Sequence, residues 1–351
     1  MCPLVLELKK RTGIECKVCL TGQHREMLDQ VMECFQIKED YNLAIMQKAQ
    51  TLTSITTLIL ERLKPVLTAE KPDVVLVHGD TTTSFAAALA AFYEQIPVGH
   101  VEAGLRTGNM YSPFPEEMNR CLTGRLATYH FAPTDKNVEN LKKENIINNV
   151  FITGNTVIDA FETTVKNGYC FHDASINETD FTDQRVILVT AHRRENLGRP
   201  LENICRAIKR IVADYNDVLV VYPVHLNPRV RETVDEYLGG QKRILLTEPL
   251  DVLDMHNLMA KSYMVMTDSG GLQEEAPALG KPVLVMRTET ERPEAVEAGT
   301  AMLVGIEEQP IYEQAAELLD SETKYRQMAR AVNPYGDGHA SKRIADILTK
   351  K

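Results

Sequence analysis

Three carboxylates could act as acids and bases, and two of them stand just after apolar runs of the sequence. Asp80 follows the run Asp73–Val77, Glu102 follows Pro97–Val101, and Glu116 follows a proline-rich stretch. Like charges crowded into one place separate into a group that keeps its proton and one that loses it, which supplies an acid and a base. A lone aspartate at such a position is more often a helix cap, so the prediction depends on all three converging.

Basic side chains follow two apolar runs in the second half of the chain. His192 and Arg193 come after Val186–Thr190, and His225 comes shortly after Val218–Tyr222. A histidine beside arginines suits phosphate or diphosphate, because both can donate charge-assisted hydrogen bonds. A purely structural histidine is an equally good interpretation for His225.

A Ser-Gly-Gly turn further along the chain is the densest signal for a nucleotide. Ser269, Gly270 and Gly271 would present bare backbone N–H groups at the start of a helix, where a phosphate can approach closely. Glu275, one turn later, is placed to accept hydrogen bonds from ribose hydroxyls, and Arg292 adds a cation. The pattern is neither a dinucleotide fingerprint nor a P-loop, so it predicts a nucleotide-diphosphate site of another kind.

These residues need a scaffold that brings the ends of many strands together, and the apolar pattern supplies one. Short β-branched runs alternate with longer amphipathic stretches, which is typical of parallel strands buried on both faces. The predicted strands are Glu15–Leu20, Asp73–Val77, Pro97–Val101, Tyr129–Ala132, Val150–Ile152, Val186–Thr190, Val218–Tyr222, Ile244–Leu246, Met264–Thr267, Pro282–Val285 and Met302–Val304. We expect an α/β protein with two Rossmann-like, doubly wound domains, in which ligands bind outside the carboxyl ends of the strands.

The domain boundaries follow from the positions of the turn residues. A hinge is expected after Gly154, and a polar insertion from Asn167 to Arg185 opens the second half. The segment Asn333–Gly338 breaks the chain before a last helix from about Ala340, which we expect to return to the first domain. The predicted domains are therefore 1–154 plus 340–351, and 155–339.

Composition narrows the class of protein. The 351 residues are 44% hydrophobic and 25% charged, which is the balance of a globular protein with a large core. The net charge of −10 argues against a nucleic-acid partner, which requires a basic surface. No apolar run reaches the length of a membrane span and no signal peptide is visible, so a cytoplasmic location is predicted.

The cysteines give no metal or redox prediction. Seven are scattered along the chain, and the single C-x-x-C pair, Cys16 and Cys19, falls in a predicted strand. Residues three apart on a strand point to opposite faces, so shared metal ligation or disulfide pairing is not expected there.

Taken together, these motifs resemble the family of non-hydrolysing UDP-N-acetylglucosamine 2-epimerases. The resemblance is carried by HGDTTT at 78–83, GHVEAGLRT at 99–107, PEEMNR at 115–120, HRREN at 192–196, YPVHLNP at 222–228, TDSGGLQEEAP at 267–277, ERPE at 291–294 and NPYGDG at 333–338. These strings are spread over essentially the whole chain.

The resemblance implies a glycosyltransferase-B-like fold with the active site in the interdomain cleft. It also implies interconversion of UDP-GlcNAc and UDP-ManNAc without NAD, metal or other cofactor, through elimination and re-addition of UDP, for cell-envelope polysaccharide precursors. By position, Asp80, Glu102 and Glu116 are then the acid–base carboxylates and His192 an active-site residue near the diphosphate. The implied substrate-binding residues are Arg120, Ser269, Gly270, Gly271, Glu275 and Arg292.

The resemblance carries three further expectations. A second UDP-GlcNAc is expected to activate the enzyme at a regulatory site formed by Gln47, Gln50, Arg193 and His225. Family members are usually homodimers. The family's first strand and its Gly-Thr-Arg-Pro-Glu loop, about fifteen residues that should precede Met1, are not in this sequence, and loss of a central strand should weaken folding or activity.

Other functions fit parts of the pattern. A hydrolysing relative would release free ManNAc and UDP from the same site. A glycosyltransferase-B-type transferase shares the fold, although three carboxylates are more than an inverting transferase needs. An inactive nucleotide-sugar-binding paralogue is the third alternative, against which the intact carboxylates argue.

Overall fold

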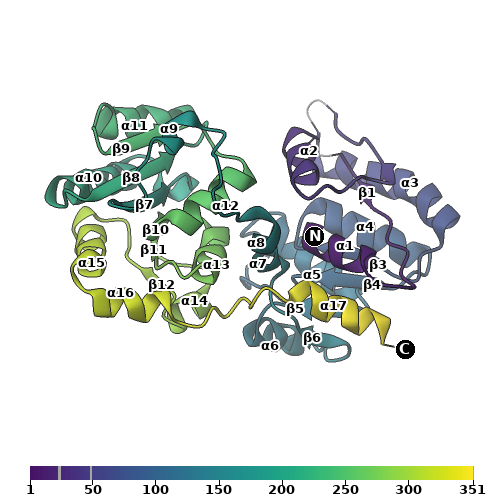
Figure 1. Ribbon diagram of the computed structural model, residues 1–351. Helices are drawn as coiled ribbons and strands as arrows, with labels where there is room; N and C mark the ends of the chain where they lie inside the picture. Colours follow the sequence, from purple (N-terminus) through teal and green to yellow (C-terminus); the bar gives the residue numbers. More distant parts are fainter. Residues whose placement is uncertain (23–24, 48–49, 351) are drawn as a thin grey trace. The chain divides into compact units, whose positions relative to one another are not determined.

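The computed structural model describes residues 1–22, 25–47 and 50–350 and divides into two units (Figure 1). Unit 1 comprises Met1–Ala160 and Tyr335–Lys351, and unit 2 comprises Phe161–Pro334. Each unit is a parallel sheet covered by helices, which confirms the prediction of two Rossmann-like α/β domains. Among the described residues, no helix is both long and apolar enough to span a bilayer.

Unit 1 contains a four-stranded parallel sheet in the order β3-β4-β5-β6. Its strands are β3 (Val75–His78), β4 (Val98–Val101), β5 (Tyr129–Ala132) and β6 (Val150–Ile152). A separate parallel pair is formed by β1 (Cys19–Leu20) and β2 (Tyr41–Asn42). The helices are α1 (Cys2–Lys9), α2 (Arg25–Cys34), α3 (Leu52–Glu70), α4 (Thr82–Tyr93), α5 (Glu116–Leu126), α6 (Asp135–Lys143), α7 (Thr156–Asp159) and α17 (Ala340–Thr349).

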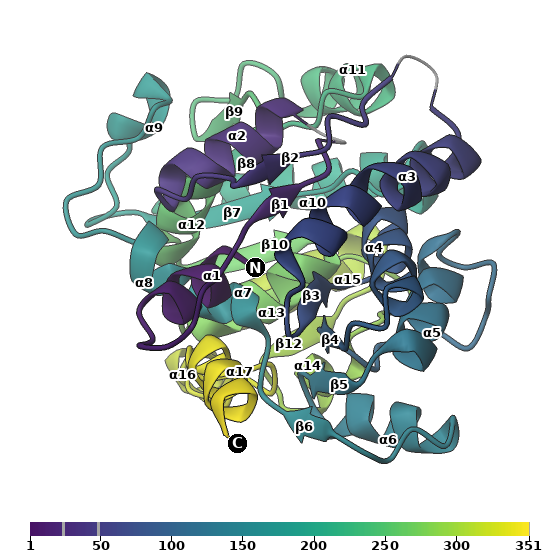
Figure 2. The ribbon, with the colours of Figure 1, turned by 90° about the vertical axis from the view of Figure 1, so that its right-hand side faces the viewer.

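Two hydrophobic clusters place the helices of unit 1 on the sheet. On one face α3 and α4 pack against β3 and β4 through Ile59, Ala88, Val77 and Val98. On the other face α1 and α17, which lie side by side in both ribbon views, pack against β4 and β5 (Figures 1 and 2). The sheet is thus buried on both faces, as its continuous apolar runs predict.

Unit 2 contains a six-stranded parallel sheet in the order β12-β11-β10-β7-β8-β9. Its strands are β7 (Arg185–Thr190), β8 (Val218–Pro223), β9 (Ile244–Thr247), β10 (Met264–Thr267), β11 (Val283–Val285) and β12 (Ala301–Leu303). The helices are α8 (Phe161–Thr164), α9 (Ala174–Asn177), the 3₁₀ turn η1 (Arg194–Asn196), α10 (Arg199–Asp214), α11 (Pro228–Leu238), α12 (Val252–Lys261), α13 (Gly270–Ala278), α14 (Pro293–Glu297), α15 (Glu308–Asp320) and α16 (Glu322–Ala329). The largest core joins α10, α11 and α15 to one face of this sheet.

The first predicted strand, Glu15–Leu20, is the clearest error. Only Cys19 and Leu20 form a ladder, and their partner strand β2 was not predicted. The backbone amide of Val18 instead donates to the Asp40 side chain, with N and Oδ2 2.7 Å apart, so a side chain replaces a strand partner there. Alternation of apolar residues therefore overestimated the length of this strand.

The unit boundaries lie a few residues from the predicted ones. The chain leaves unit 1 after Ala160 rather than 154, because α7 packs against α17. It returns at Tyr335 rather than 340, because the carbonyl of Tyr335 accepts a hydrogen bond of 2.7 Å from the amide of Asn155. The final helix begins at Ala340 and belongs to unit 1, as predicted.

Candidate functional site

In unit 1, Asp80 is held by a buried arginine on a neighbouring helix. Asp80 ends the turn after β3 and is half-buried, and one of its oxygens forms an ion pair with the Nη2 of Arg120 on α5. The adjacent Asn119 donates from Nδ2 to the backbone carbonyl of Asp80 at 3.0 Å. Two successive side chains of α5 thus fix both the backbone and the carboxylate of Asp80.

The same arginine binds a second carboxylate, Glu117, which was not predicted. Arg120 Nη1 lies 3.1 Å from Glu117 Oε2, and only 5% of Arg120 and 2% of Glu117 are exposed. The Glu117 carboxylate also accepts from the backbone amides of Thr107 (3.0 Å) and Gly108 (2.9 Å). A buried charge is tolerable only when it is paired and hydrogen-bonded, and Glu117 meets both conditions.

Glu102 lies next to Asp80 in an uncommon backbone conformation. Its φ is +65°, in the left-handed region that a non-glycine residue rarely adopts outside functional or tightly constrained positions. Its Oε1 accepts from Asn155 Nδ2 at 3.2 Å. A Cβ on Gly79 would lie 2.9 Å from Glu102 Oε2, so the glycine before Asp80 leaves the room that the Glu102 carboxylate occupies.

Glu116 opens α5 and is half-buried. It precedes Arg120 by four residues, so the two side chains lie on the same face of the helix. The structure thus brings Asp80 and Glu102 together at Gly79. It places Glu116 on the face of α5 that carries Arg120, the partner of Asp80.

Two histidines beneath these carboxylates are kept neutral by burial. Burial lowers the pKa of His100 to about 4 and that of His78 to about 3. His100 Nε2 lies 2.8 Å from the carbonyl oxygen of Gly79, so the ring also supports the turn that carries Asp80.

In unit 2 the buried Asp268 organises the loop after β7. Its side chain is fully buried, and its Oδ2 accepts from the backbone amides of His192 and Arg193, both at 2.8 Å. The Nδ2 of Asn196 donates to the same oxygen at 3.0 Å. One carboxylate at the end of β10 therefore shapes the loop that follows the adjacent strand β7.

The N-terminus of α13 lies beside two guanidinium groups. A Cβ on Gly270 would lie 3.7 Å from Arg193 Nη2 and 3.9 Å from Arg292 Cζ. The N-cap residue Ser269 makes no side-chain hydrogen bond to the helix, so the hydroxyl does not occupy the first-turn amides. A helix N-terminus combined with two cations is a site for an anion such as phosphate.

Arg292 is itself fixed by an acidic partner. Its Nε forms an ion pair with Glu274 of α13, and both residues are buried. The next residue, Glu275, has its Oε2 3.6 Å from the Nε2 of His256, and its Oε1 lies close to Gly271.

His192 and His225 form a stacked pair at the ends of β7 and β8. Their ring centroids lie 5.2 Å apart, and their planes differ by 7°. Burial lowers the pKa of His192, while Asp268, 3.4 Å away, acts in the opposite direction. A neutral imidazole here keeps one nitrogen able to donate and one able to accept.

Comparison with known proteins identifies the family. The sequence matches the family described as UDP-N-acetylglucosamine 2-epimerase over residues 6–349. The chain is 57% identical to the UDP-N-acetylglucosamine 2-epimerase of Bacillus subtilis, over 99% of this chain and 91% of that protein. The chain belongs to the UDP-N-acetylglucosamine 2-epimerase family.

Solved structures of epimerases share its fold. The UDP-GlcNAc 2-epimerase of Neisseria meningitidis bound to UDP-GlcNAc superposes with a TM-score of 0.89 and 50% identity, covering 100% of this chain and 96% of that one. The enzyme of Methanocaldococcus jannaschii in complex with UDP-GlcNAc and UDP gives a TM-score of 0.77 at 34% identity, covering 99% of this chain and 95% of that one. The expected fold, with two Rossmann-like domains as in glycosyltransferase-B enzymes, is confirmed.

Arg120 has a different environment from the one expected of a substrate-binding residue. Both of its terminal nitrogens are engaged, one by Asp80 and one by Glu117. The geometry therefore favours a role in holding Asp80, and direct contact with substrate remains a prediction.

Sequence reasoning missed four residues that organise the site of this epimerase. They are Glu117, Asn155, Asp268 and Glu274. The rule that polar residues after strands are informative could have found Asp268, which directly follows β10. Asn155 and Glu274 act through partners far away in sequence, and Glu117 binds backbone amides nine and ten residues before it, which no local pattern shows.

The residues of the predicted regulatory site occur in both units. Gln47 is exposed in unit 1, and the side-chain amide of Gln50 donates to the carbonyl of Ile45 at 2.5 Å. In unit 2, Arg193 lies near Gly270 and His225 stacks on His192. Activation of this epimerase by a second ligand stays a prediction.

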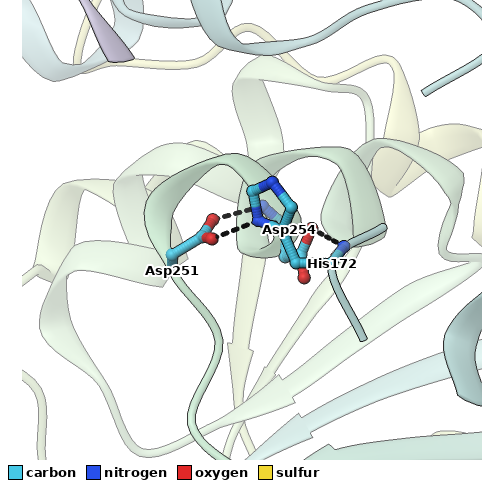
Figure 3. A group of neighbouring side chains, drawn as sticks. All are labelled: His172, Asp251 and Asp254. Carbon is cyan, nitrogen blue, oxygen red and sulfur yellow. Dashed lines mark hydrogen bonds and ion pairs between the residues drawn. The ribbon is translucent and has the colours of Figure 1, made fainter. Parts of the chain in front are cut away.

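One group of potential metal ligands occurs among the described residues, away from these motifs. It consists of His172, Asp251 and Asp254, whose ligand atoms lie within 4.8 Å of one another (Figure 3). His172 Nδ1 lies 2.6 Å from Asp251 Oδ2, and Asp254 accepts from the hydroxyl of Tyr169 and the amides of His172 and Asp173. Because these carboxylates already have donors, we interpret the group as a tether between the polar insertion and the start of α12.

Proposed function

We propose that this protein interconverts UDP-GlcNAc and UDP-ManNAc by reversible inversion at C2 of the sugar, without hydrolysis. The observation that carries the proposal is that Asp80 and Glu102 follow the adjacent strands β3 and β4 of unit 1, with the Glu102 carboxylate against Gly79, in a member of the 2-epimerase family. The proposed chemistry needs a base near C2 and stabilisation of negative charge on the leaving diphosphate.

The proposed reaction proceeds by elimination and re-addition. A carboxylate removes the proton from C2, the electron pair of that C–H bond forms the C1=C2 double bond, and the bond from C1 to the diphosphate oxygen breaks. UDP then adds back to C1 while a proton is delivered to the opposite face of C2. The two faces require two proton-transferring groups, which is why more than one carboxylate is needed.

Asp80, Glu102 and Glu116 of unit 1 are the proposed acid–base residues. Asp80 is oriented by Arg120, and Glu102 by Asn155 and by its constrained backbone. Carboxylates that are already fixed in place need little reorganisation before a proton moves, which lowers the barrier.

Unit 2 supplies the proposed diphosphate site. Its donors are the first-turn amides of α13, the Ser269 hydroxyl, Arg193 and Arg292, with His192 nearby. These groups would neutralise the charge that develops on UDP as the bond to C1 breaks. Glu275, beside Gly271, is the proposed partner of the ribose hydroxyls, although its second oxygen lies near His256.

The proposal extends to the pathway, the oligomeric state and the regulation of the enzyme. The product would be a precursor of cell-envelope polysaccharides, made in the cytoplasm, and the active form would be a homodimer. A second UDP-GlcNAc would activate the enzyme by binding at Gln47, Gln50, Arg193 and His225. Light scattering in solution tests the dimer. A sigmoidal dependence of rate on UDP-GlcNAc, lost in Gln50→Ala, tests the activation.

The reaction is tested by incubating the protein with UDP-GlcNAc in D₂O and following C1 and C2 by proton NMR. We expect UDP-ManNAc to appear with deuterium at C2. Free ManNAc with UDP would identify a hydrolysing enzyme. Unchanged UDP-GlcNAc, with UDP binding retained, would contradict the proposed reaction.

A further inference from the structure

We propose that Glu117 is the positioning residue that sets both Asp80 and the loop leading to Glu116, and that its charge tunes Asp80 through Arg120. This inference rests on the proposed function, since it assigns Asp80 and Glu116 to proton transfer. Glu117 follows the predicted catalytic residue Glu116 in the sequence, but its side chain binds Arg120 and the amides of Thr107 and Gly108.

The first step is the connection from Glu117 to the loop. The carboxylate accepts from the amides of Thr107 and Gly108, at 2.9–3.1 Å, and these residues begin the loop that ends at the start of α5. Glu117 therefore ties the beginning of the loop to α5, where the loop ends. Glu116 is the first residue of α5 and directly follows that closed loop, so its placement depends on the closure.

The second step is the connection from Glu117 to Asp80. Arg120 bridges the two carboxylates with separate nitrogens, Nη1 to Glu117 and Nη2 to Asp80. The bridge is 5% exposed at Arg120 and 2% at Glu117, so water screens these charges weakly. Arg120 cannot lose its proton, so its single positive charge is shared between two negative ones.

Among the described residues of unit 1, other ionisable groups also lie near Asp80. Glu102 approaches Gly79, and His78 and His100 lie below, neutral because burial lowers the pKa of each. The amino group of Met1 acts on both Glu102 and His78, and burial lowers its pKa. Arg120 contacts both Glu117 and Asp80, so a change at Glu117 reaches Asp80 through Arg120.

The shared cation predicts opposite effects for two neutralising substitutions. In Glu117→Gln the charge of Arg120 serves Asp80 alone, so the acid limb of the pH–rate profile moves to lower pH, by about half a unit to one unit. In Arg120→Gln two carboxylates lose their cation, and the acid limb moves to higher pH by about one unit or more. In both variants the looser loop lowers kcat about tenfold, while KM stays within about twofold.

The experiment measures kcat for UDP-ManNAc formation against pH in the wild type, Glu117→Gln, Arg120→Gln and Arg120→Lys. Arg120→Lys keeps the charge, so its acid limb stays with the wild type although kcat falls. The matched control is Glu94→Gln, which breaks the ion pair with the exposed Lys64 in the same unit, away from this loop. Acid limbs that move in the same direction, or not at all, would overturn the inference.

A second measurement does not depend on activity. Amide hydrogen exchange of the segment 105–118 should accelerate in Glu117→Gln and remain unchanged in Glu94→Gln. Unchanged exchange in both would overturn the positioning role even if the wild type were inactive. An inactive wild type with accelerated exchange in Glu117→Gln would instead contradict only the proposed reaction.

Discussion

The two units use ion pairs in opposite ways. In unit 1 the buried cation, Arg120, orients the carboxylate of Asp80, which is the group that acts in the proposed chemistry. In unit 2 the buried carboxylates serve the cations: Glu274 fixes Arg292, and Asp268 shapes the loop that carries Arg193. The same strand–turn–helix architecture therefore yields a site for proton transfer in one unit and a site for an anion in the other.

The difference indicates that a carboxylate should face the ligand in unit 1 and a cation should face it in unit 2. A group that transfers protons must be oriented while keeping an oxygen available to the substrate. A group that binds a diphosphate must direct its charge towards the ligand. Substitutions that neutralise a charged residue of each unit should separate these roles. A substitution in unit 1 should lower kcat, and one in unit 2 should lower the affinity for UDP.

The largest effect is expected for Asp80→Asn. Loss of a proton-transferring carboxylate should lower kcat by about 10²–10⁴-fold, because general acid–base catalysis contributes about that much. Binding of UDP, measured by calorimetry, should stay within about twofold of the wild type, since UDP is assigned to unit 2. Asp73→Asn, an exposed aspartate before β3, is the control. A tenfold loss of UDP affinity in Asp80→Asn would break the comparison.

Arg193→Gln should have the complementary effect. Its guanidinium lies near Gly270, so losing one charge-assisted contact should raise the Kd for UDP by about 10–100-fold. The effect should shrink at high salt. The neighbouring Arg194 is exposed, and Arg194→Gln should leave the Kd unchanged. Equal losses in the two variants would show that net charge alone accounts for the binding.

Asp268→Asn tests whether the buried carboxylate of unit 2 is a scaffold. Three donors converge on Asp268 Oδ2, so neutralising it should lower the free energy of unfolding by about 1–3 kcal/mol and weaken UDP binding with it. Urea unfolding measures the first effect and calorimetry the second. Asp217→Asn, an exposed ion-pair partner of Arg185 in the same unit, should cost less than about 1 kcal/mol.

His100 should make unit 1 sensitive to acid. Burial lowers its pKa to about 4, so below about pH 6.5 the unfolded chain takes up a proton that the folded one refuses. Stability is therefore lost as the pH falls from about 6.5 towards 4, by roughly 2 kcal/mol at about pH 5. Urea unfolding of His100→Gln should show a flatter dependence on pH.

The smallest effect is expected at the tether in Figure 3, outside both sites. Asp251 raises the pKa of His172, so the attraction is fully present below the ordinary histidine value and is lost as the pH rises through the raised one. The amide protection factors of the segment 167–184, which are corrected for the intrinsic pH dependence of exchange, should fall over that range and should be independent of pH in His172→Asn. Activity should not change.

Much of the scaffold could be predicted from the apolar runs alone. The bounds of β5, β6 and β10 are the predicted ones, because each run ends at a polar or turn residue. The strands β7 and β8 are each one residue longer than predicted, since Arg185 and Pro223 pair in the ladder although they are not apolar β formers. The strand β2 could not be predicted, because a two-residue strand carries no periodic signal.

The candidate site divides in the same way. Asp80 and Glu102 could be proposed as candidates because residues after parallel strands gather at one edge of a sheet, and the structure places both after adjacent strands. The distinction between Glu116 and Glu117 could not be made, because it depends on which face of α5 meets Thr107 and Gly108. That face is set by tertiary packing, which a local pattern does not contain.

The two passages of the chain between the units lie beside each other in unit 1. The amide of Asn155 bonds to the carbonyl of Tyr335, and a Cβ on Gly154 would lie 3.2 Å from the Cα of Gly336. Unit 2 is thus an insertion whose two ends meet. During synthesis all of unit 2 leaves the ribosome before α17, whose Ile344 completes the core of unit 1. The half of the protein that begins first therefore finishes folding last.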